Sequence, residues 1–167
     1  MNIQIRPMQE TDLPQVVAIE NRWLFLSKWG KEGYRRVIKD ARIYTCVVAE
    51  DVEPDHSPEK PVIAGFAVLA LLIEYSELCN IVVTPEYLSM KVGYRLLQRC
   101  LEVSEHSGTP RMVLEVRISN QRAIRFYEKN GFSIASRRKN YYRNPPEDAW
   151  VMERKLLRKD ARASNSP

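Results

Sequence analysis

The sequence has few of the residues that most catalytic and structural metal sites use. It has only two histidines, His56 and His106, and both lie in polar surroundings. Its three cysteines, Cys46, Cys79 and Cys100, are odd in number and far apart, and each lies in an apolar run. This distribution fits neither a disulfide framework nor a zinc site. We therefore expect reduced core thiols, no metal, and no mechanism built on a Ser-His-Asp or Cys-His arrangement.

Long apolar segments are also missing. The longest apolar run, Val62 to Ile73, has twelve residues, fewer than the roughly 18 that span a bilayer as a helix. The first residues, Met1-Asn2-Ile3-Gln4-Ile5-Arg6, include no apolar core of signal-peptide length. We therefore expect a cytoplasmic protein with no membrane partner.

The composition is that of a soluble enzyme or binding protein. The chain has 167 residues, of which 44% are apolar and 28% charged, enough for one packed core but short for two domains. We expect one domain over residues 1–157, a polar disordered tail over 158–167, and a monomer. No internal repeat or linker divides the sequence.

The positive charge is concentrated near the carboxyl end. The formal net charge is +5, and residues 137–162 hold nine Lys/Arg against four Asp/Glu, so the remaining residues balance at 17 against 17. A local basic cluster favours an anionic partner, either a phosphorylated cofactor or RNA near the protein. The alternative is a basic segment that simply faces water.

Hydrophobic periodicity predicts an α+β protein. The expected order is strand, two helices, three strands, helix, strand, helix, two strands. We expect Thr11 to cap the first helix, Asn120 to cap the last, and Gly65 to mark a bulge. The expected strands cover residues 3–5, 42–50, 62–73, 78–83, 112–116, 132–142 and 149–156. The expected helices cover 12–20, a short segment after a loop within 22–40, 92–103, and the residues between Asn120 and Asn130.

Glu115 is the most informative single residue. It interrupts the apolar sequence Met112-Val113-Leu114 and Val116, and a carboxylate rarely enters such a strand unless it is paired or used. Burial raises the pKa of a carboxyl group above about 4.3, toward that of a useful general base. The alternative is a structural ion pair with Arg117 or Arg111.

Three further features have a structural and a functional interpretation. Tyr127 lies on the inward face of the last helix, as a core aromatic would, but a phenol with a pKa of about 10 also suits protonation of a leaving thiolate. Asn120 at a helix start is normally a cap. The segment from Ser89 to Arg95 precedes a helix, whose unpaired N–H groups suit a pyrophosphate.

Together these motifs identify a family resemblance. Over residues 3–157 the chain resembles the GNAT superfamily of acetyl-CoA-dependent N-acetyltransferases, and within it the RimI-like ribosomal-protein-alanine N-acetyltransferases. The motifs that carry the resemblance are Leu114-Glu115-Val116-Arg117-Ile118-Ser119-Asn120, Phe126-Tyr127-Glu128, Asn130-Gly131-Phe132, Arg138-Lys139-Asn140-Tyr141-Tyr142 and Asn80-Ile81-Val82-Val83-Thr84-Pro85. The resemblance implies a mixed, mostly antiparallel sheet of six to seven strands flanked by about four helices.

The resemblance also implies roles for individual residues. Glu115 matches the proton acceptor and Tyr127 the proton donor. Tyr141 and Tyr142 match aromatics that flank the acceptor peptide. The residues that match contacts to acetyl-CoA, the acetyl donor, are Ile81, Val82 and Val83 beside the pantetheine arm, Ser89, Met90, Lys91, Val92, Gly93 and Tyr94 in the pyrophosphate loop, and Asn120.

One loop departs from the family pattern Gln/Arg-x-x-Gly-x-Gly/Ala. Its three defined positions are Leu88, Lys91 and Gly93 here, so only the last is kept. Glycine at the Lys91 position would allow free φ and close approach to phosphate. The Lys91 side chain therefore crowds that approach, although Lys91 and Arg95 add positive charge.

The implied reaction is direct acetyl transfer to an amine, without metal or covalent enzyme intermediate. A backbone N–H near Val83 would stabilise the carbonyl oxygen. An α-amine titrates at about 7.7–8.0 and a lysine at about 10.4, so a water-linked Glu115 suits a protein N-terminus better. A ribosomal-protein acceptor follows from the resemblance alone. The alternatives are a lysine, polyamine or small-molecule acceptor, a silent CoA-binding or ribosome-associated module, and a plain RNA-binding protein.

Overall fold

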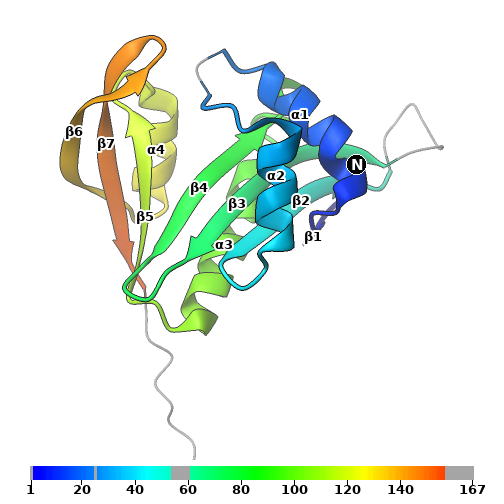
Figure 1. Cartoon of the computed structure of the whole chain (residues 1–167), viewed down its shortest axis with the longest axis horizontal. Helices are drawn as coiled ribbons and strands as arrows, with labels where there is room; N and C mark the ends of the chain where they lie inside the picture. Colours follow the sequence, from blue (N-terminus) through cyan, green and yellow to red (C-terminus); the bar gives the residue numbers. More distant parts are fainter. Residues whose placement is uncertain (1, 25, 54–60, 157–167) are drawn as a thin grey trace, which may run out of the picture. The chain divides into compact units, whose positions relative to one another are not determined.

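The structure is a computed structural model that describes residues 2–24, 26–53 and 61–156 (Figure 1). Within these ranges the chain forms seven strands, four α-helices and two 3-10 turns, in the order expected from the sequence. The elements are β1 (Ile3–Pro7), η1 (Glu10–Asp12), α1 (Leu13–Asn21), α2 (Gly30–Lys39), β2 (Tyr44–Asp51), β3 (Val62–Leu71), β4 (Ser76–Val83), η2 (Pro85–Tyr87), α3 (Val92–Ser107), β5 (Arg111–Arg117), α4 (Gln121–Lys129), β6 (Ser133–Arg143) and β7 (Pro146–Lys155).

The expected α+β class and mixed sheet are confirmed. The strands hydrogen-bond in the order β1-β2-β3-β4-β5-β7-β6. β4 and β5 run parallel, while β1–β2, β2–β3, β5–β7 and β6–β7 are antiparallel. The chain divides into two compact units, residues 1–70 with 78–100 (unit 1) and residues 71–77 with 101–167 (unit 2). The expectation of one domain stays a prediction, and the tail 158–167 lies outside the described residues.

Unit 1 is built around β3, which is buried on both faces. Figure 1 shows α1 and α2 covering one face of its strands and α3 the other. Phe66 and Val68 of β3 join the core under α1 and α2, and the alternate residues Ala67 and Leu69 are fully buried as well. A strand covered on both faces reads as an unbroken apolar run, which explains the sequence from Val62 onward.

Gly65 is required where β3 approaches β4. A Cβ at this position would lie 2.5 Å from the Val82 carbonyl oxygen, closer than any side chain tolerates. Ala49 pairs with Gly65, but Glu50 pairs with Ile63, so one residue of β3 is extra. The bulge expected at Gly65 is therefore confirmed.

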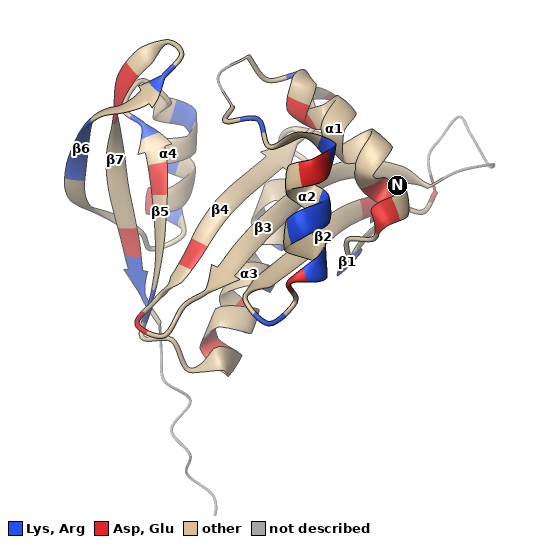
Figure 2. Ribbon diagram, in the orientation of Figure 1, with Lys and Arg blue, Asp and Glu red and all other residues tan. Residues whose placement is uncertain are grey.

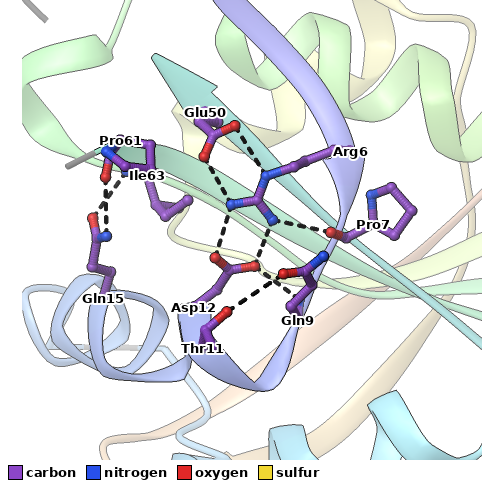
Figure 3. A network of polar contacts seen from close by, with 9 residues as sticks. All are labelled: Arg6, Pro7, Gln9, Thr11, Asp12, Gln15, Glu50, Pro61 and Ile63. Atoms are coloured by element: carbon purple, nitrogen blue, oxygen red, sulfur yellow. Dashed lines mark hydrogen bonds and ion pairs between the residues drawn. The ribbon is translucent and has the colours of Figure 1, made fainter. Parts of the chain in front are cut away.

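An ion-pair network fixes the start of unit 1 (Figure 3). Arg6 of β1 donates to both carboxylate oxygens of Asp12, at 2.7 and 2.8 Å, and to those of Glu50 in β2, at 3.0 and 2.9 Å. Asp12 also accepts the Gln9 N–H at 2.8 Å. The expectation that Thr11 caps the first helix is wrong, because a 3-10 turn precedes α1 and its capping box uses Gln9 and Asp12.

Unit 2 contains α4 and the strands β5, β7 and β6. The Asn120 side chain accepts the Ala123 N–H at 3.1 Å, which confirms the expected cap. At the other end, Gly131 has a φ of +82°. The Gly131 and Phe132 N–H groups donate to the carbonyls of Glu128 and Tyr127, a helix ending that glycine favours. Ser76 and Glu77, the first residues of β4, pair with β5 in this unit.

Candidate active site

Glu115 lies on the more open face of β5. Met112, Leu114 and Val116 are buried, whereas Val113 and Glu115 on the opposite face are partly exposed. The Glu115 side chain is 12% exposed. Glu115 is thus largely buried, but it alternates with the core residues of the strand and does not replace one of them.

The open face of β5 forms the floor of a hollow of about 440 Å³ within unit 2. The hollow also takes side chains from β4, β6 and β7. β6 has the most Lys and Arg residues of these strands, and Asp or Glu residues lie on β5 and β7 (Figure 2). The lining residues are Tyr75, Glu77, Arg111, Val113, Glu115, Ala135, Ser136, Arg138, Tyr141, Val151 and Glu153.

The ion pair of Glu115 is formed with an arginine that the sequence did not suggest. Arg138 of β6 lies 3.3 Å from a Glu115 carboxylate oxygen. The two suggested partners are engaged elsewhere, Arg111 with Glu153 at 3.2 Å and Arg117 with Glu147 at 3.1 Å. The suggestion that Arg117 or Arg111 pairs with Glu115 is therefore wrong.

The electrostatic surroundings of Glu115 favour a proton acceptor. Burial raises the pKa of Glu115, the nearby Glu77 carboxylate raises it further, and Arg138 opposes both. The net result is a pKa above the ordinary value for glutamate. The direction agrees with the expectation from the sequence, and its main cause is desolvation.

Tyr127 is part of the buried face of α4. Its ring is 7% exposed and meets Phe126 and Phe132 edge to face, with centroids 5.3 and 5.6 Å apart. This packing agrees with a core aromatic. A role as proton donor stays a prediction, because the hollow is lined by Tyr75 and Tyr141 rather than Tyr127.

The two adjacent tyrosines of β6 lie in different surroundings. Tyr141 lines the hollow, and the Arg138 guanidinium lies 5.5 Å from its ring centroid. Tyr142 lies under the Arg117 guanidinium at 4.1 Å, and burial raises the pKa of its hydroxyl to about 12. The expected pair therefore divides into an aromatic wall at Tyr141 and a packing aromatic at Tyr142.

The expected pyrophosphate loop is in unit 1, between β4 and α3. Ser89 and Lys91 have φ values of 69° and 61°, and Met90 between them does not have a positive φ. Alternation in the sign of φ is one feature of the backbone nests that bind anions, but the Met90 N–H already donates to the Tyr87 carbonyl at 3.3 Å. The loop leads into α3 at Val92, a 16-residue helix whose first amides lack intrahelical acceptors. Binding of a phosphate group at this loop stays a prediction.

The loop between α1 and α2, which would shape the acceptor site if the acceptor were a lysine, polyamine or small molecule, contacts the end of β4 and η2. The Trp23 indole N–H donates to the Val83 carbonyl at 3.2 Å, at the end of β4. Arg22 pairs with Glu86 at 2.6 Å. The loop ends where the buried Glu20 carboxylate accepts the backbone N–H groups of residues 29 and 30.

The cysteines and charges were partly foreseen. Cys46 and Cys100 are buried and Cys79 half-buried, all as free thiols. Burial raises the pKa of Cys46 to about 11, which disfavours the thiolate.

His56 and residues 157–162 of the basic cluster lie outside the described residues. Arg137 of that cluster pairs with Asp148 at 2.6 Å, and an RNA contact stays a prediction.

Among the described residues, no three His, Cys, Asp or Glu side chains gather as metal ligands would. No helix in the described part of the chain is long and apolar enough to cross a membrane.

Comparison with known proteins identifies the family. The acetyltransferase (GNAT) family matches residues 7–132. A putative [ribosomal protein bS18]-alanine N-acetyltransferase of Bacillus subtilis (strain 168) is 29% identical over 149 residues, 89% of this chain and 92% of the relative. The [ribosomal protein bS18]-alanine N-acetyltransferase of Salmonella typhimurium (strain LT2) is 31% identical over 152 residues, 87% of this chain and 92% of the relative.

A solved structure agrees. The ribosomal-protein-S18-alanine N-acetyltransferase of Escherichia coli superposes with a TM-score of 0.78 at 27% identity, covering 98% of this chain and 100% of that one. The resemblance to the RimI-like group, first drawn from the motifs, is thereby confirmed. The chain belongs to the acetyltransferase (GNAT) family.

Proposed function

We propose that this protein transfers an acetyl group from acetyl-CoA to the α-amine of a protein N-terminus, and that the acceptor is a ribosomal protein. The observation that carries the proposal is the placement of Glu115, a carboxylate with a raised pKa that lines a hollow on an open strand face. The acceptor class is supported by the names of two relatives that match most of the chain.

The reaction needs one proton acceptor and one proton donor. The acceptor nitrogen bonds to the acetyl carbonyl carbon while the carbon–sulfur bond breaks. We assign the amine proton to the Glu115 carboxylate and the proton that the sulfur gains to the Tyr127 hydroxyl. A general base works best when its pKa approaches the working pH, and the desolvation of Glu115 moves its pKa in that direction.

Acetyl-CoA supplies the activated acetyl group. We assign its pyrophosphate to the loop of Ser89 to Lys91 and the first turn of α3, where Val92, Gly93 and Tyr94 lie. The left-handed Ser89 and Lys91 support this assignment. The end of β4 (Ile81, Val82 and Val83) is assigned to the pantetheine arm. The Asn120 side chain already caps α4. We therefore propose that Asn120 acts on acetyl-CoA indirectly, by stabilising the start of α4 beside the ligand.

An α-amine is the acceptor that this site suits best. Deprotonating a lysine at neutral pH costs about 3–4 kcal/mol more than deprotonating an α-amine, because their pKa values differ by about 2.5 units at 1.36 kcal/mol each. Tyr141 gives the hollow an aromatic wall against which the first residues of a peptide can pack. Tyr142, held by Arg117, is assigned to supporting that wall.

A panel of peptides tests the proposal directly. With acetyl-CoA, a lysine-free peptide with a free N-terminal alanine should gain 42 Da, and a peptide with a blocked N-terminus and one internal lysine should not. Glu115→Gln and Tyr127→Phe should each slow transfer by about 10²-fold or more with an unchanged melting temperature. Glu128→Gln, on the exposed side of α4, is the matched control and should transfer at the wild-type rate.

The results separate the proposal from its alternatives. Transfer only to the lysine peptide would replace the proposed acceptor. Transfer to neither peptide, together with a normal acetyl-CoA thermal shift, would favour a silent CoA-binding module. Wild-type rates in both Glu115→Gln and Tyr127→Phe would remove the assigned proton transfers.

A further inference from the structure

Among the described residues, the Glu115 carboxylate has one cationic partner at ion-pair distance, and more than half of that partner's side chain is exposed. Arg138 approaches a single oxygen of Glu115 at 3.3 Å, and its side chain is 54% exposed, against 12% for the carboxylate. Its other contact is the ring of Tyr141 at 5.5 Å. A guanidinium that is half exposed to water and contacts one carboxylate oxygen can be replaced by another cation at little net cost in free energy.

Arg117 shows what a fixed cation in unit 2 looks like, whereas Arg111, with a side chain 46% exposed, resembles Arg138 more closely. Arg117 is 9% exposed, pairs with Glu147, and donates to the carbonyls of Asn144 and Pro145. Arg111 pairs with Glu153 at 3.2 Å. Neither is placed to neutralise Glu115, so that task falls to Arg138.

The charged and titratable groups around Glu115 come from four strands, β4, β5, β6 and β7. β4 contributes the Glu77 carboxylate, and Glu77 pairs in register with Val113 of β5. β5 contributes Arg111 and Arg117, each already paired. β6 contributes Arg138, Tyr141 and Tyr142, and β7 contributes Glu147 and Glu153, the partners of the two paired arginines. The Glu115–Arg138 pair therefore has Glu77 as its close, opposing neighbour.

We propose that Arg138 is a positioning residue that holds the Glu115 carboxylate in the free enzyme. When the acceptor binds, its ammonium group displaces the Arg138 guanidinium from the carboxylate. Glu77 favours this exchange of one cation for another. The proposal rests on the assigned role of Glu115 as proton acceptor. The ammonium group takes the place of the guanidinium beside the carboxylate. One of its protons then passes to Glu115 and leaves the neutral amine, so the exchange conserves charge.

The electrostatics of the carboxylate agree with this geometry. Burial raises the pKa of Glu115, Glu77 raises it further, and Arg138 lowers it. Removing Arg138 should therefore raise the pKa of Glu115, and removing the Glu77 charge should lower it.

The experiment follows the Glu115 carboxyl carbon by ¹³C NMR in protein labelled on glutamate, with Glu115→Gln to assign the signal. We expect the titration midpoint to move up by about one unit in Arg138→Gln and down by a similar amount in Glu77→Gln. Arg138→Lys, which keeps the charge, should restore most of the wild-type midpoint. Arg137→Gln, the neighbouring arginine that pairs with Asp148, removes the same charge and should move the midpoint little.

Kinetics provide the second readout. In Arg138→Gln the acidic limb of kcat/KM should move to higher pH, and KM for the acceptor should fall several-fold above that limb. Glu77→Gln should raise KM and move the limb to lower pH.

Shifts of equal sign in the two variants, or an equal shift in Arg137→Gln, would overturn the role of Arg138. If Glu115→Gln keeps wild-type activity, the assigned base itself fails. If Glu115→Gln is inactive but the midpoints do not move, only the role of Arg138 fails.

Discussion

At the scale of single residues, two positions of the loop before α3 adopt a positive φ without glycine. Lys91 has a φ of 61° and Ser89 a φ of 69°, values that residues with a Cβ adopt at a cost of roughly 1–2 kcal/mol. The chain forms this loop despite the strain. Glycine is thus not essential for forming the loop, although it would form it with less strain.

Replacing Lys91 by glycine should relieve that strain. Glycine loses about 0.5–1 kcal/mol in chain entropy on folding, so we expect Lys91→Gly to raise the free energy of unfolding by up to about 1 kcal/mol. Urea denaturation measures the change. Met90→Gly is the matched control, because Met90 has no positive φ, and it should lower the free energy of unfolding by about 0.5–1 kcal/mol. Destabilisation by both variants would mean that the Lys91 conformation is not strained.

At the scale of elements, Arg117 joins the end of β5 to the turn between β6 and β7. Its guanidinium donates to the Glu147 carboxylate and to the carbonyls of Asn144 and Pro145, and it covers the ring of Tyr142 at 4.1 Å. The Ser119 N–H donates to the same Glu147 carboxylate at 2.7 Å. These contacts hold the tyrosine pair of β6 in place.

Truncation of Arg117 should therefore loosen this corner of unit 2. Arg117→Ala leaves the half-buried Glu147 carboxylate without its cationic partner and removes the bonds to two carbonyls, so we expect it to lower the free energy of unfolding by about 2–4 kcal/mol. Arg117→Lys loses the fork of donors but keeps the charge. We therefore expect its free energy of unfolding to fall by less than half as much as that of Arg117→Ala. Chemical denaturation gives both values, and a loss below about 0.5 kcal/mol in Arg117→Ala would contradict the argument.

The element order followed from the sequence, whereas the pairing around the site did not. Periodicity placed the strands and helices because each presents one or two apolar faces over its own length. The partner of Glu115 depends on β6 lying beyond β7 in the sheet, which periodicity within one strand does not encode. For the same reason Arg138 and Glu77 were missed, and Arg117 and Arg111 were the obvious but wrong partners. Thr11 was chosen as a cap because the 3-10 turn before α1 leaves no signal in the apolar pattern.

The network at Arg6 should make unit 1 sensitive to acid. Burial by itself raises the pKa of Asp12, but hydrogen bonds from Arg6 and the Gln9 N–H outweigh it and keep the pKa below its ordinary value. A lowered pKa in the folded state stabilises the fold above the unfolded value of about 3.9, and this contribution is lost as the pH falls through the folded value.

The predicted consequence is a pH-dependent effect of Asp12→Asn. We expect this variant to lower the free energy of unfolding by about 1–3 kcal/mol at pH 6, with the difference from wild type shrinking toward pH 2–3. Asp40→Asn is the matched control, because Asp40 faces the exposed Arg42 at 3.7 Å, and it should change stability by less than about 0.5 kcal/mol. Urea denaturation at several pH values decides the matter, and a difference that does not vary with pH would refute the assignment.

At the scale of the whole molecule, two elements run through both compact units. β4 has its first residues, Ser76 and Glu77, in unit 2 and the rest in unit 1, and α3 passes from unit 1 to unit 2 after Cys100. A continuous strand or helix cannot melt in one half without weakening hydrogen bonds in the other, because helix and ladder bonds form cooperatively. The two units should therefore unfold together.

Calorimetry tests this expectation together with the proposed donor. We expect one transition whose van't Hoff enthalpy equals the calorimetric enthalpy, roughly 120 kcal/mol for a chain of this length. Acetyl-CoA at 100 times its Kd adds about 2.7 kcal/mol, and at about 2–4 °C per kcal/mol the melting temperature should rise by about 5–11 °C. Desulfo-CoA, which lacks the thioester but keeps the pyrophosphate, should give most of this shift if the Ser89–Lys91 loop holds the phosphates. Two separate transitions would instead mean that each unit folds on its own, and only the unit that binds the ligand would then move.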